Sequence, residues 1–219
     1  MNKSKVSFPK QRDFQRAYQM AYKLACDELA GIKDIAEQCY RSGASLTEEG
    51  SKRIIAIDYL NRESHITLPD LTISTVDSNQ QLSLKDSLLI LHYFLRAGGH
   101  PLSNQLITFK ELPEGSIYFP NLYKRAVKPV LAEFGRQPQR LLAAAKNLGG
   151  VKANFGDMAV TIKGFPYVPL TIVLWQGDDE LSPEGSILFD SSISDYLATE
   201  DITVLCQTVA YKLACIPER

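Results

Sequence analysis

Helix-forming and strand-forming segments occur in blocks along this chain and do not alternate one by one. Apolar and aromatic residues recur at helical spacing over residues 13–39, with a break expected near Gly31. β-Branched residues with partial alternation then fill residues 53–75, with a first turn at 61–64. Because strict alternation of strands and helices is typical of parallel α/β folds, this order predicts an α+β fold with antiparallel sheets packed against helices.

A buried helix and a helical C-terminus complete the pattern. The segment LSLKDSLLILHYFLRAGGH predicts a helix that begins near Ser83, is apolar on nearly all sides and ends at Gly98 and Gly99. The segments DMAVTIKGF and VPLTIVLW predict an antiparallel hairpin around Pro166, and a last helix is expected over 202–214. We therefore expect one globular domain over residues 1–219, with helices at both ends.

The charge balance and hydropathy exclude several classes of function. With 24 Lys and Arg against 25 Asp and Glu, the formal charge is -1. The chain therefore lacks the basic excess that nucleic-acid-binding proteins present. No run of about 18 apolar residues is available to span a bilayer, and no apolar run of signal-peptide length follows the basic N-terminus. We expect a cytoplasmic protein that binds neither nucleic acid nor membranes.

The four cysteines, Cys26, Cys39, Cys206 and Cys215, match no cofactor motif. None belongs to a C-x-x-C pair of the kind that holds zinc or an iron–sulfur cluster, and four are too few for a disulfide scaffold. Buried or half-buried free thiols are the simplest interpretation. No intrinsic iron–sulfur or zinc site is expected, and the chain also lacks the standard phosphate-loop, dinucleotide and G-x-S-x-G motifs.

The stretch LWQGDDELSPEGSILFD holds the only tryptophan, Trp175, beside Asp178, Asp179 and Glu180. Carboxylates this close together raise the pKa of at least one of them or recruit a cation, so these three are candidate metal ligands. The loop lacks the D-x-[DN]-x-[DN]-G spacing of calcium sites. A solvated acidic turn and a partner-docking surface stay open as alternatives.

His92 is a candidate of a different kind, because it lies mid-helix among large apolar neighbours. A histidine in this position can be a general base, a metal ligand or a core residue with one hydrogen bond. Further along, LPEGSIYFPNLYKRAVKP combines aromatic residues with Lys124, Arg125 and Lys128. These residues could hold an anionic ligand or form one solvated basic face of a helix.

Three phrases together resemble an uncharacterised domain-of-unknown-function family of mainly anaerobic bacteria and archaea. They are LILHYFLRAGGHPLSNQLITFKELPEGSIYF, the glycine pair after KNL, and PYVPLTIVLWQGDDELSPEGSILFDSSISDYLATED. The resemblance covers about residues 82–205 and extends loosely over the N-terminal third. The matching positions are His92, Tyr93, Phe109, Gly115, Tyr118, Pro169, Trp175, Gly177, Asp178, Glu180, Phe189 and Asp190.

Some members of that family carry a fused cysteine-rich motif for a four-iron, four-sulfur cluster, like that of corrinoid proteins. The resemblance therefore implies a cofactor- or partner-binding accessory domain linked to corrinoid or iron–sulfur metabolism, with an iron–sulfur or corrinoid protein as its partner. The cysteine-rich motif is absent from this chain, so a cluster would have to come from the partner. The resemblance implies no catalytic residue.

Three hypotheses follow for the role of these residues. In the first, a ligand or partner site forms where the hairpin meets the buried helix, lined by Trp175, Asp178, Glu180, His92 and Tyr93. In the second, the chain is a metal-assisted or acid–base enzyme that uses the acidic cluster 178–180, with His92 carrying protons. In the third, the motif is architectural, with Trp175 in the core, Gly177 in a left-handed turn and Asp190 capping a helix.

Overall fold

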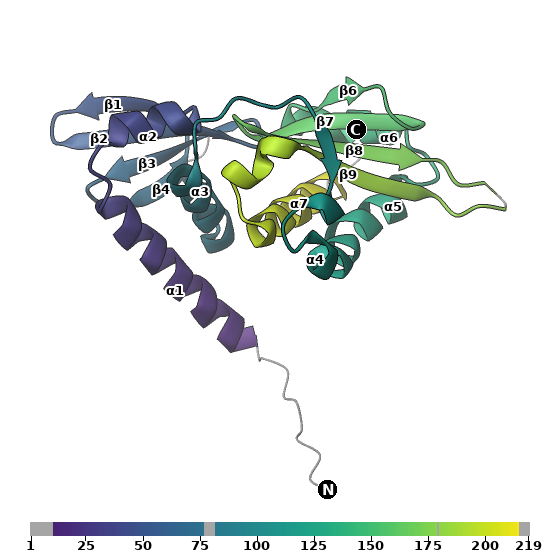
Figure 1. The fold of residues 1–219 in the computed structure, drawn as a ribbon, viewed down its shortest axis with the longest axis horizontal. Helices are drawn as coiled ribbons and strands as arrows, with labels where there is room; N and C mark the ends of the chain where they lie inside the picture. The colour runs from purple at the N-terminus through teal and green to yellow at the C-terminus, as the bar shows by residue number, and fades with distance from the viewer. Residues whose placement is uncertain (1–10, 77–81, 179, 215–219) are drawn as a thin grey trace, which may run out of the picture.

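The computed structural model describes residues 11–76, 82–178 and 180–214. It confirms the α+β class, because helices pack against two antiparallel sheets. Figure 1 shows the two sheets side by side along the long axis of the molecule, with α4, α5 and α7 on one side of the larger sheet. None of the helices in the described ranges combines the length and the apolar character needed to cross a bilayer.

The N-terminal helical segment consists of two helices, α1 (Gln11–Ala30) and α2 (Ile35–Ser42). The predicted break near Gly31 is therefore confirmed. Helix α2 is capped by Asp34, whose carboxylate accepts the Glu37 N–H at 2.9 Å. Gly43 ends it in the left-handed conformation, with φ of 67°. Helix α1 packs on α3 and extends away from the body of the molecule (Figure 1).

The smaller sheet has the order β1-β2-β3-β4. Its strands are β1 (Ser45–Glu49), β2 (Lys52–Tyr59), β3 (Arg62–Leu68) and β4 (Thr72–Thr75). The turn after β2 is earlier and tighter than predicted, because Leu60 and Asn61 both adopt positive φ and β3 begins at Arg62. Strand β1 lies before the strand-forming segment predicted over residues 53–75, and because nearly all its side chains are exposed it carries no alternating pattern.

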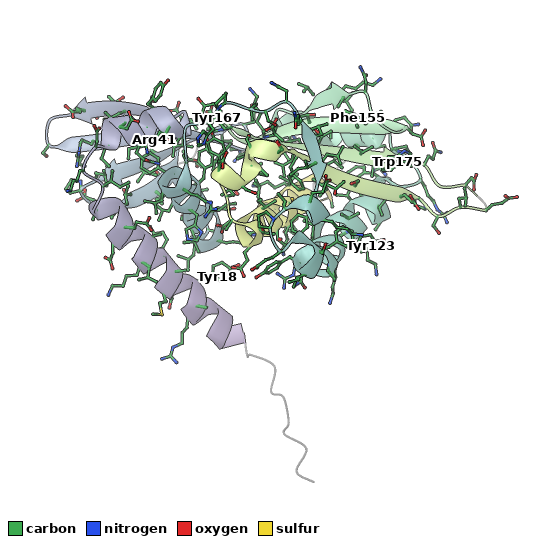
Figure 2. The ribbon with its side chains drawn as sticks, viewed as in Figure 1. Tyr18, Arg41, Tyr123, Phe155, Tyr167 and Trp175 are labelled. Atoms are coloured by element: carbon green, nitrogen blue, oxygen red, sulfur yellow. The ribbon has the colours of Figure 1, made fainter. Side chains whose placement is uncertain are left out.

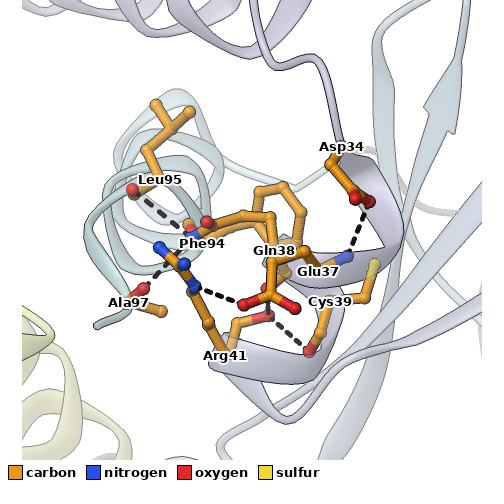
Figure 3. Close-up of polar contacts among 9 residues, drawn as sticks. Asp34, Glu37, Gln38, Cys39, Arg41, Phe94, Leu95 and Ala97 are labelled. Carbon is orange, nitrogen blue, oxygen red and sulfur yellow. Dashed lines mark hydrogen bonds and ion pairs between the residues drawn. The ribbon is translucent and has the colours of Figure 1, made fainter. Parts of the chain in front are cut away.

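The predicted buried helix is α3 (Leu84–Arg96), which begins after Ser83. The Ser83 hydroxyl accepts the Asp86 N–H at 3.1 Å. Figure 3 shows how α2 is joined to the other end of α3: the Gln38 amide donates to the carbonyl oxygens of Phe94 and Ala97. Because the last carbonyls of a helix have no partner within it, Gln38 supplies the missing donor.

The larger sheet has the order β5-β9-β8-β7-β6 and every pair in it is antiparallel. Its strands in chain order are β5 (Leu106–Thr108), β6 (Val151–Ala153), β7 (Met158–Phe165), β8 (Val168–Trp175) and β9 (Glu184–Asp190). The β7–β8 hairpin around Pro166 is confirmed. The two sheets are joined where the Leu60 N–H donates to the Gly164 carbonyl at 3.1 Å.

The helices of the second half are α4 (Gly115–Leu122), α5 (Lys128–Phe134), α6 (Arg140–Ala145) and α7 (Thr199–Ala214). Helix α4 is followed directly by a π-helical turn over Tyr123–Val127, which leads into α5. In this turn the Lys128 N–H donates to the Tyr123 carbonyl five residues before it. The next residue, Pro129, has no N–H to donate, which accounts for the irregular bonding here.

Buried side chains from both sheets and from the helices form one continuous hydrophobic cluster around α3 and α7. Three of the cysteines lie in the described ranges as free thiols: Cys39 and Cys206 are buried and Cys26 is half-buried. Burial raises the pKa of Cys39 to about 11 and also raises the pKa of Cys206. These two thiols therefore stay protonated at neutral pH. Cys215 lies outside the described residues.

Candidate functional site

A cavity of about 390 Å³ lies where α1, α3, α4 and α7 meet. Its apolar wall includes Tyr18 and two alanines of α1 with Leu88 of α3. The polar side chains that line it are His92, Tyr118, Asn121, Arg125, Glu200 and Asp201. A mainly apolar hollow with a few polar groups is typical of a small-molecule site.

His92 of α3 and Asp201 of α7 form the central polar pair of this cavity. The His92 Nδ1 lies 2.9 Å and 3.0 Å from the two carboxylate oxygens of Asp201. Because a carboxylate only accepts, Nδ1 carries the hydrogen and Nε2 is the nitrogen left for a ligand. No hydrogen bond from Nε2 to another described residue is present.

The pair with Asp201 changes the proton affinity of His92. The hydrogen bond raises the pKa of His92 above its ordinary value of 6.5, partial burial opposes that rise, and the charges of Asp201 and Glu28 add to it. The imidazole is therefore charged over a larger part of the neutral pH range than a free histidine. It can give up or take a proton at Nε2 while Asp201 holds its orientation.

Tyr118 of α4 and Glu200 of α7 form a second pair across the same cavity. The Tyr118 hydroxyl donates to the Glu200 carboxylate, and this hydrogen bond raises the pKa of the phenol. Glu200 and Asp201 both lie in the first turn of α7, where the helix dipole stabilises negative charge. One helix end thus presents two carboxylates, each engaged by an aromatic side chain from a different helix.

Arg125 lies in the π-helical turn between α4 and α5. It lines the cavity, and within the described ranges its guanidinium makes no ion pair. Single π-helical turns inside longer helices are frequent at functional sites, because they displace side chains from regular helical positions. A cation without a partner at the rim of a cavity can hold a carboxylate or phosphate of a ligand.

Trp175 lies elsewhere, at the end of β8. Its side chain is 43% exposed and pairs in register with Glu184 of β9. Figure 2 shows Trp175 toward the far end of the larger sheet, on the opposite side of the molecule from Tyr18 of α1. The expectation that Trp175 belongs to the core is therefore wrong, and it does not line the cavity that contains His92.

The acidic cluster forms a closed turn. One carboxylate oxygen of Asp178 accepts the N–H groups of Glu180 at 2.9 Å and Leu181 at 2.7 Å, and these bonds lower the pKa of Asp178. Gly177 is not left-handed as expected; a Cβ there would lie 2.5 Å from Pro183, so close packing requires the glycine. Asp179 lies outside the described residues.

No group of three or more His, Cys, Asp or Glu side chains among the described residues is arranged to hold a metal ion. Tyr93, the neighbour of His92, is fully buried and donates to the Ser42 carbonyl at 2.7 Å. Its ring stacks on Phe165 at 4.2 Å. The five residues of the first hypothesis therefore do not form one site. His92 lines the cavity and Tyr93 lies in the core, whereas Trp175, Asp178 and Glu180 lie at the end of β8 and in the turn that follows it.

The role of Asp190 as a cap is confirmed. Its carboxylate accepts the Ser192 N–H at 3.0 Å at the start of the 3-10 segment Ser191–Asp195. It also accepts the Ser103 N–H at 2.9 Å and the Asn104 N–H at 2.7 Å. Burial would raise the pKa of Asp190, but the bonds from Ser192 and Ser103 outweigh it and bring the pKa to about 2.

A family model described as Domain of unknown function (DUF3786) matches residues 34–212. The chain belongs to this family. The match begins after α1 and contains every polar cavity residue named above. Neither the curated proteins nor the solved structures include a match to the chain. The resemblance to a domain-of-unknown-function family is thus confirmed, while the link to anaerobes and iron–sulfur proteins stays a prediction.

Sequence reasoning identified His92 and considered Arg125 but missed Asp201, Glu200 and their contacts. His92 and Asp201 are 109 residues apart, so no local pattern joins them. The run TED (residues 199–201) at the start of α7 could have indicated these two carboxylates. Acidic residues in the first turn of a helix are so common, however, that capping explained them fully.

Proposed function

We propose that the cavity between α1, α3, α4 and α7 binds a small organic molecule, and that His92 exchanges a proton with it. The observation that carries this proposal is the hydrogen bond from His92 Nδ1 to Asp201, which orients the ring and leaves Nε2 available. A positioned histidine with a carboxylate behind it is the usual form of a general acid or base. The proposal keeps the acid–base hypothesis, but its carboxylate is Asp201 of α7 and not one of the acidic turn after β8.

The residues around His92 limit the type of reaction. Thr203 lines the cavity, but its hydroxyl donates to the Thr199 carbonyl at 3.0 Å, so it is poorly placed to act as a nucleophile. Apolar side chains of α1 and α3 can cover the body of a ligand, while Arg125 offers a charge for an anionic group. Proton transfer to or from a bound organic acid is the chemistry that these groups support.

A thermal-denaturation panel tests the proposal. The purified protein is heated under anaerobic conditions with corrinoids, haem, divalent metals, nucleotides and anionic metabolites. A ligand present at about 100 times its Kd adds about 2.7 kcal/mol to the free energy of unfolding and raises the midpoint by roughly 5 to 10 °C. His92→Gln should abolish the shift, whereas His65→Gln, in the smaller sheet, should keep it.

Arg125 offers a matched pair of variants. Arg125→Gln should weaken binding of anionic ligands, whereas Lys128→Gln, which lies nearby outside the cavity lining, should bind like the wild type. A ligand that raises the midpoint equally in wild type, His92→Gln and Arg125→Gln binds elsewhere, and the proposal is wrong if every ligand that shifts the midpoint behaves in this way.

We also propose, as a second candidate, that the chain is a cytoplasmic accessory domain that docks an iron–sulfur or corrinoid protein through the end of the β8–β9 hairpin. The supporting observation is the exposure of Trp175 at 43% and Leu181 at 69% beside the turn that Asp178 closes. Exposed tryptophans are frequent energetic centres of interfaces. Trp175→Ala should abolish co-elution with a purified corrinoid or iron–sulfur protein, and unchanged co-elution would refute this candidate.

A further inference from the structure

A second cavity, of about 310 Å³, lies at the other end of the α3–α7 pair. Helix α3 contributes Asp86 to this cavity and His92 to the first one. Helix α7 contributes Lys212 here and Asp201 there. At a rise of about 1.5 Å per residue these positions are about 9 Å apart along α3 and about 16 Å apart along α7. The two cavities therefore contact separate sets of side chains.

The second cavity has an excess of cationic groups. Arg62 at the start of β3 and Lys212 near the end of α7 both line it, and neither makes an ion pair within the described ranges. The carboxylate that faces them is Asp86. Its two oxygens accept from the Tyr59 hydroxyl at 2.7 Å and from the Ser83 hydroxyl at 2.6 Å. Asp86 is thus bound to neutral donors rather than to the cations.

Lys85 precedes the cavity residue Asp86 on α3, and its charge interacts with that of Lys212. Partial burial lowers the pKa of Lys85, Asp86 opposes that effect, and Lys212 lowers the pKa further. The influence of Lys212 shows that like charges lie near one another at this end of α3 and α7. Cations placed together at a concave surface raise the local concentration of anions.

The remaining lining suits an organic molecule rather than a bare ion. Tyr211 is 70% exposed and Asn147 provides an amide, while Leu60 and Leu148 supply apolar surface. We infer that this second cavity binds a small, multiply charged organic anion, with Arg62 and Lys212 as its counterions. The inference goes beyond the proposed function, because none of these side chains lines the cavity of His92.

Isothermal titration calorimetry at low ionic strength tests the inference, with pyrophosphate and citrate as separate probes. One equivalent of at least one probe should bind, and added salt should weaken the binding because exposed charges are screened. Tighter binding of pyrophosphate would assign the site to phosphate esters, and tighter binding of citrate to polycarboxylates. Either result supports an anion site.

Matched variants decide whether the cavity is responsible. Arg62→Gln and Lys212→Gln should each raise the Kd about tenfold, because each removes one close charge pair with the ligand. Arg53→Gln and Lys152→Gln remove the same charges from exposed strand positions and should leave the Kd unchanged. His92→Gln should also bind the probe normally, which separates this site from the proposed function. The inference would be overturned if neither pyrophosphate nor citrate bound, or if Arg62→Gln, Lys212→Gln and the wild type bound equally.

Discussion

The acidic turn after β8 and the first turn of α7 both place carboxylates close together in the sequence, but they use them differently. Asp178 bonds the backbone N–H groups of Glu180 and Leu181, so its charge closes the loop that contains it. Asp201 bonds a histidine 109 residues away, at the wall of a cavity. Adjacent carboxylates in a sequence therefore indicate a turn as readily as a site. The partner that a carboxylate meets in the fold distinguishes the two.

Asp190 extends the comparison to a buried carboxylate, and the largest effect is expected there. Asp190→Ala removes the acceptor for N–H and hydroxyl groups of Ser103, Asn104 and Ser192. The N–H and hydroxyl of Ser192 are buried, and buried donors left without a partner cost about 1 to 3 kcal/mol each, so the free energy of unfolding should fall by about 2 kcal/mol or more. Urea denaturation at pH 7 measures this change. A loss below about 1 kcal/mol would contradict the role assigned to Asp190.

The low pKa of Asp190 also predicts how its contribution depends on pH. Its pKa is about 2 in the folded chain against an ordinary value of 3.8, so the folded state favours the charged form. The stabilisation is therefore complete above about pH 4 and is lost as the pH falls through about 2. The stability difference between wild type and Asp190→Asn should shrink over that window in urea titrations. A constant difference would contradict the assigned pKa.

His92 and Tyr93 provide a second contrast, of intermediate size, between adjacent residues. Tyr93→Phe removes the hydrogen bond to the buried Ser42 carbonyl and should lower the free energy of unfolding by about 1 to 2 kcal/mol, without changing ligand binding. His92→Gln should do the reverse, with loss of ligand binding and a smaller change in stability. Chemical denaturation and the ligand panel measure both variants. Loss of binding in Tyr93→Phe would show that the core and the cavity are coupled.

The acidic turn should give the smallest effect. Asp178→Asn keeps an acceptor for the backbone N–H groups of Glu180 and Leu181, and the turn is at the surface. The unfolding midpoint should change by no more than about 2 °C, with or without divalent cations in the buffer. Glu180→Gln is the matched control. A midpoint that rises with added magnesium or calcium in wild type but not in Asp178→Asn would restore the metal-site hypothesis.

Some helices and strands could be predicted from the local sequence and others could not. Helix α3 could be predicted because its cap, its apolar sides and its terminal glycines all lie within the segment. Strand β9 could not, because it contains Gly185 and Ser186 and is held as a strand by its neighbours β5 and β8. Strand β1 was missed for a related reason, since its exposed side chains show no alternation.

Part of the candidate site could also be predicted from the sequence, and part could not. The residue type and position of His92 were sufficient to select it, because a histidine within an apolar helix requires a polar partner. The partner could not be identified, because the fold alone brings α7 against α3. Trp175 and Asp178 were selected because the only tryptophan in the sequence stands close to three successive acidic residues. The hydrogen bond from the Leu181 N–H to Asp178 accounts for this carboxylate without a ligand.

The most direct test is a histidine NMR titration of the wild type and Asp201→Asn. The chain has three histidines, so the signals of His65 and His100 serve as internal controls. Because the hydrogen bond to Asp201 raises the pKa of His92, its titration midpoint should lie above 6.5 in the wild type. It should fall in Asp201→Asn. An unshifted His92 midpoint in the variant would contradict the pairing on which the proposed acid–base site rests.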